Sequence, residues 1–265
     1  MISIARAPAR AARSRLRYLG GLGYLVADGL WWMLIGAPKR KGRLRVAETI
    51  AQATRLSIRS FGIVSLVIFF IGMILAFQMA YVLQALGVVE YVANIIGVAM
   101  VREMGPLLVG MVMTGFAGAA IAAEIGTMVV SEEVLALETT ALDPVNFLVV
   151  PRLLAAMVMI PLVTLVAEYI GVLGGFTIGC FLLDMDAVFY LNRTVDALQY
   201  KDVITGLIKA EAFGALIVAI ACHEGLKVTG GAEGVGRATT NAVVRSIVAI
   251  IICDLLFTAF FYFFL

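Results

Sequence analysis

Residues 60–87 read "SFGIVSLVIFFIGMILAFQMAYVLQALG", and this stretch decides the fold. No Asp, Glu, Lys or Arg stands between Arg59 and Glu90. A transmembrane helix needs about 20 consecutive apolar residues to cross the hydrocarbon core of a bilayer. The stretch is therefore long enough to span a membrane, and it lacks the alternation that marks a β-strand.

The composition extends this conclusion to the whole chain. Of its 265 residues, 62% are hydrophobic and 14% are charged. Soluble domains carry about 45–50% apolar and about 25% charged residues. The apolar runs are also too long for the strands of a membrane barrel. We predict an all-α integral membrane protein with about five transmembrane helices.

The remaining spans follow from the apolar runs and their breaks. Gly105-Pro106 in "REMGPLL" disfavours a continuous helix, so we expect a short re-entrant segment before the second span. Pro161 can kink the third span. Polar residues 184–202 predict short helical turns, and residues 227–241 predict a Gly-rich loop. We expect the second to fifth spans at about 105–127, within 147–183, at about 203–226 and at about 243–265.

Positive charge is concentrated near the N-terminus. Residues 1–59 hold twelve Lys or Arg and two acids, so they carry +10 within a chain of net charge +2. Cytoplasmic segments of membrane proteins are enriched in Lys and Arg, so we expect a cytoplasmic N-terminus and, after five spans, a periplasmic C-terminus. Contact with anionic lipid explains the basic segment more simply than nucleic acid does.

Residues 1–17 are rich in Arg and Ala, and the mostly apolar residues 18–36 follow, so this part of the chain could be read as a signal peptide. However, Asp28 interrupts the apolar part, and the pair Trp31-Trp32 precedes the basic run "KRKGR". We therefore expect residues 16–36 to form an uncleaved amphipathic helix on the cytoplasmic leaflet. This divides the chain into a basic N-terminal region, 1–45, and a transmembrane domain, 46–265.

Two spans carry small residues at four-residue spacing, which lets helices approach closely in lipid. The pattern fits packing within the chain or a seam with a second copy. These residues are Gly110, Thr114, Gly118, Ala122 and Gly126 in one span, and Gly171, Gly175 and Gly179 in the other.

Residues 124–144, "EIGTMVVSEEVLALETTALDP", place a short acidic helix between two spans. We expect Ser131 to cap its N-terminus, with Glu132 and Glu133 in the first turn, and Pro144 to end it after about three turns. The helix is too short to span a bilayer, and its negative charge disfavours contact with the anionic inner leaflet. A docking surface for another protein is the better interpretation.

Several motifs in order give the chain a family resemblance. "REMGPLL", "AAEIGTM", "EEVLALETTALDP", "VVPRLLA" and "GGAEGVGRATTNAVV" resemble the MlaE/YrbE-type permeases of ABC lipid transporters associated with MCE proteins. The resemblance covers residues from about 45 to 265 and implies an inner-membrane permease that forms a homodimer. It also implies a phospholipid substrate, an MCE-domain partner and a separate ATPase subunit that binds ATP and Mg²⁺. An accessory cytoplasmic subunit is left open.

The resemblance gives the acidic helix the role of a coupling helix seated on the ATPase. The residues that it assigns to this contact are Glu132, Glu133, Leu135, Leu137 and Glu138.

Charged residues within the spans are costly and need a reason. Arg102 and Glu103 are adjacent, and Lys209 and Glu211 are two apart, so neither pair meets on one helix face. The resemblance implies that Arg102, Glu103 and Lys209 frame a phospholipid cavity, with Gln78 and Tyr81 as weaker candidates. The alternative is internal pairing of Arg102 or Lys209 with Glu103, Glu211 or Asp254, and both can hold in different states.

Three further acids lie within or beside the spans. We expect Glu124 to tie helix ends to the acidic helix or to the Gly-rich loop. Asp254 is interpreted as a structural polar partner, and Glu168 is left without a role.

The sequence contains no G-x-x-x-x-G-K-[ST] phosphate loop and no catalytic or metal-ligand spacing, so we expect no cofactor, metal or catalytic residue on this chain. Two other functions remain as alternatives, an ion-coupled secondary transporter and, less favoured, a membrane lipid enzyme. The first usually shows two repeated halves, and we find no convincing repeat.

Overall fold

The structure is a computed structural model that describes residues 18, 20–29, 31–32 and 45–264. No strand occurs within these ranges. Five helical stretches in the described part are long and apolar enough to cross a membrane, which confirms the predicted all-α membrane fold. They are Val46–Ala85, Val89–Val130, Val145–Phe181, Tyr200–Leu226 and Gly231–Phe264.

The first span is the single helix α3, Val46–Ala85. It buries one residue every fourth position, including Ser60, Val64 and Ile68. This row lies against α8, Val150–Phe181. The two backbones meet through glycines: a Cβ added to Gly72 would clash with the Gly171 carbonyl oxygen. The small-residue spacing therefore serves packing within the chain at this seam.

The second span is continuous, so the predicted re-entrant segment and break at Gly105-Pro106 are wrong. A π-turn, η3, ends at Met104, and there the Gly105 N–H bonds to the Met100 carbonyl five residues back. Pro106 stands in the first turn of the next helix, where a proline is tolerated. The span consists of η2 (Val89–Tyr91), α4 (Val92–Ala99), η3 (Met100–Met104), α5 (Gly105–Met113), η4 (Thr114–Gly118) and α6 (Ala119–Val130).

The acidic helix is α7, Glu133–Thr139, which is shorter than the predicted three turns. The predicted cap is wrong, because Ser131 ends α6 and its hydroxyl donates to the Thr127 carbonyl oxygen at 3.0 Å. Glu132 takes the N-terminal position in a left-handed conformation with φ 61° and makes no side-chain cap. This turn redirects the chain away from α6.

The chain returns to the bundle through the π-turn η5, Val145–Val149, and α8, which accommodates Pro161 inside it. The polar stretch after α8 contains one helix, α9 (Ala187–Ala197), whose start is capped by the Asp186 carboxylate accepting from the Phe189 N–H. A reciprocal capping box between Gln199 and Asp202 begins α10, Tyr200–Leu226.

The last span, α11, extends from Gly231 to Phe264. The predicted Gly-rich loop, 227–241, is thus mostly helical, and only its first residues form a turn. Gly230 and Gly231 have φ values of 90° and 68°, which L side chains rarely adopt, so these two glycines make the turn. The later glycines are accepted into a helix whose other residues favour it.

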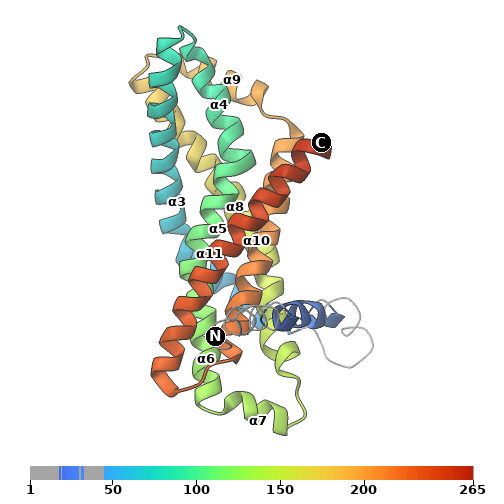
Figure 1. Ribbon diagram of the computed structural model, residues 1–265. Coiled ribbons are helices and arrows are strands. Elements are labelled where there is room, and N and C mark those ends of the chain that lie inside the picture. The colour runs from blue at the N-terminus through green and yellow to red at the C-terminus, as the bar shows by residue number, and fades with distance from the viewer. Residues whose placement is uncertain (1–17, 19, 30, 33–44, 265) are drawn as a thin grey trace, which may run out of the picture.

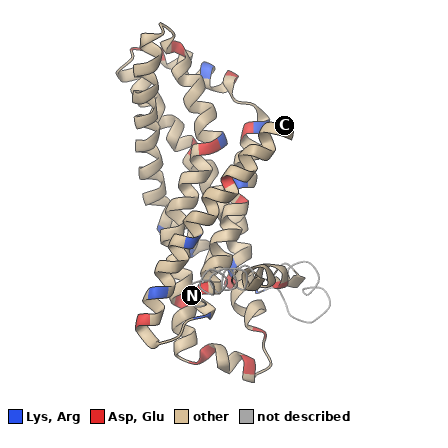
Figure 2. Cartoon of the chain, in the orientation of Figure 1, with Lys and Arg blue, Asp and Glu red and all other residues tan. Residues whose placement is uncertain are grey.

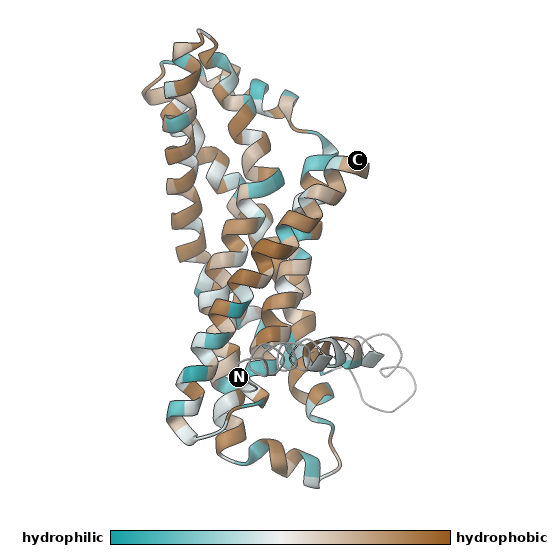
Figure 3. Ribbon diagram, viewed as in Figure 1, coloured by the Kyte–Doolittle hydropathy of each residue, from teal (hydrophilic) through white to brown (hydrophobic). Residues whose placement is uncertain are grey.

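Figure 1 shows the long helices side by side, with α7 at one end of the bundle and α9 at the other. Residues 20–29 form a helix that lies nearly at right angles to the long helices and extends to one side of the bundle, close to the α7 end. The other residues of the predicted interfacial helix, apart from 18 and 31–32, lie outside the described part. Apolar residues dominate the long helices (Figure 3), and charged residues gather mainly towards the two ends (Figure 2).

Candidate functional site

A polar cluster lies inside the bundle around Lys209 of α10. The Lys209 ammonium donates to Glu103 Oε2 at 2.5 Å and to Thr258 Oγ1 at 2.7 Å. It also forms an ion pair with Asp254 Oδ1 at 3.0 Å, without hydrogen-bond geometry. Thr258 in turn donates to Glu103 Oε1 at 3.0 Å. The cluster joins η3, α10 and α11.

The cluster supplies counterions for the Lys209 ammonium, whose charge would otherwise be very costly within a membrane. Lys209 is 1% exposed, and its single charge faces the carboxyls of Glu103 and Asp254. Of the two alternatives that the sequence left open for Lys209, this structure shows internal pairing. Thr258 was missed, because a lone threonine in an apolar helix gives no signal in the sequence.

Arg102 differs from Lys209 in its exposure. Its side chain is 45% exposed, and its guanidinium approaches Asp202 Oδ1 only to 3.8 Å. Asp202 was not among the expected partners, and it is already engaged in the capping box of α10. Arg102 therefore retains donors that could bind a phosphate or carboxylate oxygen.

Gln78 and Tyr81 lie on a different surface. Both are exposed, and Tyr81 is 82% exposed, on faces of α3 that point away from the row packed on α8. The structure does not bring them to the Lys209 cluster within one copy of the chain. Whether they contact lipid stays a prediction.

The α7 helix presents an acidic surface with apolar residues beside it. Glu132, Glu133 and Glu138 are exposed, and Leu135 is 54% exposed, whereas Leu137 is half-buried. No residue of α7 is buried. A helix that keeps an exposed leucine between carboxylates is better suited to a protein partner than to solvent alone.

An ion network joins the two spans that flank α7. Glu124 of α6 forms an ion pair with Arg152 of α8 at 2.9 Å and lies 3.6 Å from Arg55 of α3. Arg152 is 5% exposed and also donates to the Leu148 carbonyl oxygen at 2.7 Å. Glu124 thus ties helix ends together, but its partners are α3 and α8 rather than α7 or the 227–241 segment. Arg152 is not among the residues predicted from the sequence, although it lies in the motif "VVPRLLA" that carries the family resemblance.

The short N-terminal helix is held at both ends. The Tyr18 ring meets His223 edge-on at 4.8 Å and lies under Arg245 at 4.4 Å, and burial raises the pKa of its hydroxyl. At the other end, Trp32 donates to Asp143 Oδ2 at 3.2 Å, just after α7. Partial burial, with the negative charge of Asp143, raises the pKa of Asp28.

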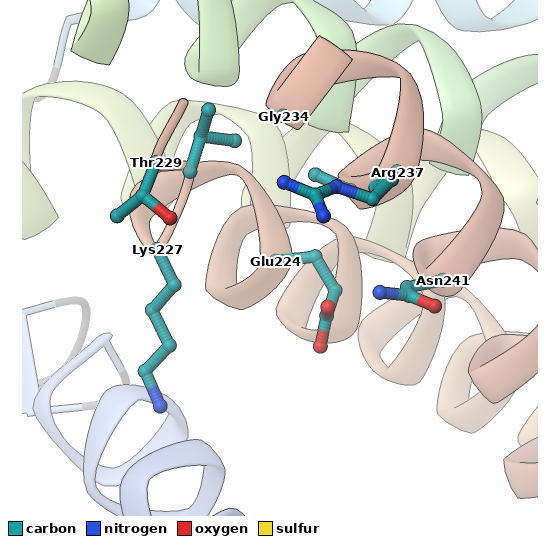
Figure 4. Close-up of a pocket in the computed structure, with 8 residues that line it drawn as sticks. Glu224, Lys227, Thr229, Gly234, Arg237 and Asn241 are labelled. Carbon is teal, nitrogen blue, oxygen red and sulfur yellow. The ribbon is translucent and has the colours of Figure 1, made fainter. Parts of the chain in front are cut away.

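A hollow of about 330 Å³ opens beside the start of α11. Figure 4 shows Arg237 and Asn241 facing Glu224 across it, while the Lys227 side chain extends towards the N-terminal helix. Glu224 is already bonded to Arg245 at 2.5 Å, and Lys227 lies 2.9 Å from His223. The free volume is therefore lined by both signs of charge.

A second hollow, of about 450 Å³, lies between α3 and α6. Arg55 and Arg59 line it together with Glu124, which lies 3.6 Å from Arg55, and with the apolar side chains of Leu56, Phe116 and Ile121. Cations next to an apolar wall suit an anionic amphiphile. In the described part of the chain, no group of three His, Cys, Asp or Glu side chains is placed to hold a metal ion.

Comparison with known proteins places this arrangement in a family. The family model described as "Permease MlaE" matches residues 49–260. A probable ABC transporter permease of Rickettsia prowazekii is 40% identical over 222 residues, covering 84% of this chain and 86% of the relative. The intermembrane phospholipid transport system permease protein MlaE of Haemophilus influenzae is 29% identical, covering 92% and 91%.

A plant relative extends the comparison. The chloroplastic protein TRIGALACTOSYLDIACYLGLYCEROL 1 of Arabidopsis thaliana is 33% identical over 222 residues, covering 84% of this chain and 63% of the relative. The match to the family model, residues 49–260, includes α7 and all of the five spans except the first residues of α3 and the last residues of α11. This multi-pass membrane protein therefore belongs to the MlaE permease family of ABC transporter permeases.

Proposed function

We propose that the chain is the membrane subunit of an ABC transporter that moves phospholipid between the bacterial inner membrane and an MCE-protein conduit. Two copies form the permease, and a separate ATPase subunit binds and hydrolyses ATP. The observation that carries this proposal is α7, an exposed acidic helix at the end of the bundle. The Haemophilus relative is named as a permease protein of an intermembrane phospholipid transport system, and this supports the choice of substrate.

The charge of α7 favours a protein partner over the membrane surface. Glu133 and Glu138 would be repelled by the negative inner leaflet, whereas they complement a basic groove on an ATPase. The basic N-terminal region and α7 then share the cytoplasmic side, and the end of α11 is periplasmic.

The ion network next to α7 provides a route for movement. Arg152 and Glu124 join α8 to α6, the two spans between which α7 is inserted. A displacement of α7 by the ATPase reaches both spans together, because this contact is largely buried on the arginine side.

The cluster near Arg102 is the proposed headgroup region. Arg102 can donate to a lipid phosphate in the state described here, and Lys209 joins it only when Glu103 and Asp254 move away. Gln78 and Tyr81 contribute from the exposed side of α3, where a second copy or lipid can approach.

The test is recovery of an ATPase with the full-length permease, purified from bacterial membranes in mild detergent. Leu135→Arg on α7 should reduce ATPase recovery by the loss of about 2 kcal/mol, roughly thirtyfold in affinity, that is typical of an interface hot spot. Leu191→Arg is the matched control, because Leu191 is 47% exposed on α9, at the opposite end of the bundle.

The outcomes separate the proposal from its competitors. Equal ATPase recovery with both variants would exclude α7 as the docking helix. Transport of phospholipid by the purified chain under a proton gradient, with no ATPase present, would instead favour a secondary transporter, and product formation from lipid would favour an enzyme.

A further inference from the structure

Glu168 is a buried acid for which the site described above has no use. It lies in the middle of α8, is 3% exposed, and its Oε1 is enclosed without a hydrogen-bond partner among the described residues. Apart from Arg152 near its start, α8 contains no other charged residue. A carboxylate so placed would bear the full cost of an unpaired charge within the membrane.

The charged groups on the neighbouring elements are engaged elsewhere. From η3, Arg102 approaches Asp202 and Glu103 bonds Lys209. From α10, Asp202 and Lys209 are therefore both occupied, and Asp254 of α11 also faces Lys209.

The remaining neighbours offer no counterion either. The membrane part of α3 after Arg59, and all of α4 and α5, contain no charged residue. On α9, Arg193 pairs with Glu90 and Asp196 is exposed to solvent. Arg102, Lys209 and Arg193 each pair with another carboxylate, so a neutral carboxylic acid is the form of Glu168 that suits this position.

A neutral acid needs an acceptor for its proton, and η3 supplies one. In this π-turn the Gly105 N–H bonds to the Met100 carbonyl, five residues back. The donor for the next carbonyl, that of Val101, would in the same register be Pro106, which has no N–H. The Val101 oxygen is therefore left without its helical donor.

Glu168 and this carbonyl both face Gly206 of α10. A Cβ added to Gly206 would stand 2.3 Å from the Val101 oxygen and 3.3 Å from Glu168 Oε1, so both oxygens border the same point. A Cβ on Gly105 would stand 3.4 Å from Glu168 Oε1 and 2.5 Å from its Cγ. The two glycines leave the room that the Glu168 side chain fills against η3.

We propose that Glu168 is a proton-binding site, at which the neutral acid donates its O–H to the Val101 carbonyl and holds the π-turn η3 in place. The ligand is one proton, exchanged with water when η3 moves away from α8. Because η3 also carries Arg102 and Glu103, the proton fixes the part of the chain that positions both side chains. This inference concerns a protonation state and stands whether or not the chain moves lipid.

The first test is infrared spectroscopy of the full-length protein in lipid nanodiscs at neutral pH. The wild type should show the C=O band of a protonated carboxylic acid, and Glu168→Gln should lack it. The triple variant Lys209→Met, Glu103→Gln and Asp254→Asn, in which no charge remains in the Lys209 cluster, should keep the band, which separates Glu168 from any proton shared in that cluster. A band that persists in Glu168→Gln, or no such band in the wild type, overturns the proposal.

A second variant tests the acceptor and leaves the carboxyl unchanged. Pro106→Ala restores an N–H that can bond the Val101 carbonyl, so the carboxylic band should move to the higher frequency of a weaker hydrogen bond. An unchanged band would exclude Val101 as the acceptor. This measurement remains decisive if Glu168→Gln fails to fold.

The sign of the pH effect gives a third readout. The folded chain holds a proton at Glu168 that an unfolded chain releases at neutral pH, so the wild type should lose thermal stability as pH rises. Glu168→Gln should lose less over the same range. Parallel curves for the two proteins would contradict a proton bound at this residue.

Discussion

Replacing Lys209 by Met is the sharpest test of the polar cluster, because it removes the cation and preserves the length of the side chain. The lysine makes two hydrogen bonds, to Glu103 and Thr258, and one ion pair with Asp254. Hydrogen bonds to charged groups contribute about 1.5–3 kcal/mol each, and breaking a buried pair from one side costs about 3–5 kcal/mol. Glu103 is 27% exposed, so the lower end, about 3 kcal/mol, is expected.

The assay is equilibrium unfolding of the purified chain in detergent micelles, followed by circular dichroism. A loss of about 3 kcal/mol lowers the folding equilibrium constant by roughly a hundredfold. The control is the triple variant Lys209→Met, Glu103→Gln and Asp254→Asn, in which no charge remains in the cluster. It should recover most of the loss, because buried ion pairs can often be replaced by neutral residues at little cost. Acid should also stabilise Lys209→Met relative to the wild type, since protonation removes the two uncompensated charges.

Two results would refute this account of the cluster. If Lys209→Met unfolds like the wild type, the carboxylates have other counterions or water. If the triple variant is less stable than Lys209→Met, the loss comes from packing rather than from unpaired charge.

Three further predictions concern other contacts. Gly174→Val should destabilise the bundle by about 1–3 kcal/mol or more, because a Cβ would lie 2.1 Å from the Phe69 carbonyl oxygen; thermal unfolding checks this, and an unchanged Tm would contradict the close approach. Asp186→Ala should cost about 1 kcal/mol through the lost cap of α9, and hydrogen exchange there should rise while α10 stays protected. Glu124→Gln should destabilise the folded chain more than Arg152→Met, because it leaves the buried Arg152 guanidinium without its carboxylate. Arg152→Met leaves the Glu124 carboxylate unpaired, but Glu124 is 39% exposed and can be hydrated. Unfolding experiments that give the reverse order would argue against the buried position of Arg152.

The sequence predicted the fold class and the number of spans because both depend on length and hydrophobicity, which are local properties. It failed where a local signal was overruled by packing. Gly105-Pro106 predicts a break, but a π-turn takes up the proline and the helix continues. The glycines after Gly231 predict a loop, yet they lie in α11, because only Gly230 and Gly231 adopt the positive φ of the turn and the later glycines are accepted into a helix.

The candidate site was only partly predictable. Arg102, Glu103, Lys209 and Asp254 stand out because charge is rare in apolar helices, and the structure brings the last three together. The identity of the partners depends on how helices rotate against one another, which spacing along one helix does not determine. Thr258 and Asp202 were missed for that reason.

The glycine seam between α3 and α8 has a consequence for how the molecule can change shape. Gly72 lies against the backbone of Gly171, and Gly174 lies against the backbone of Phe69. No side chain separates the two helices at these points, so none can change rotamer to let one helix slide over the other. Helices α3 and α8 must therefore move together as one rigid body. If the bundle widens, the helices must separate at contacts other than the one between α3 and α8. Spin labels on exposed positions of both helices, such as Phe70 and Tyr169, should keep their separation when the proposed ATPase partner is added and supplied with ATP.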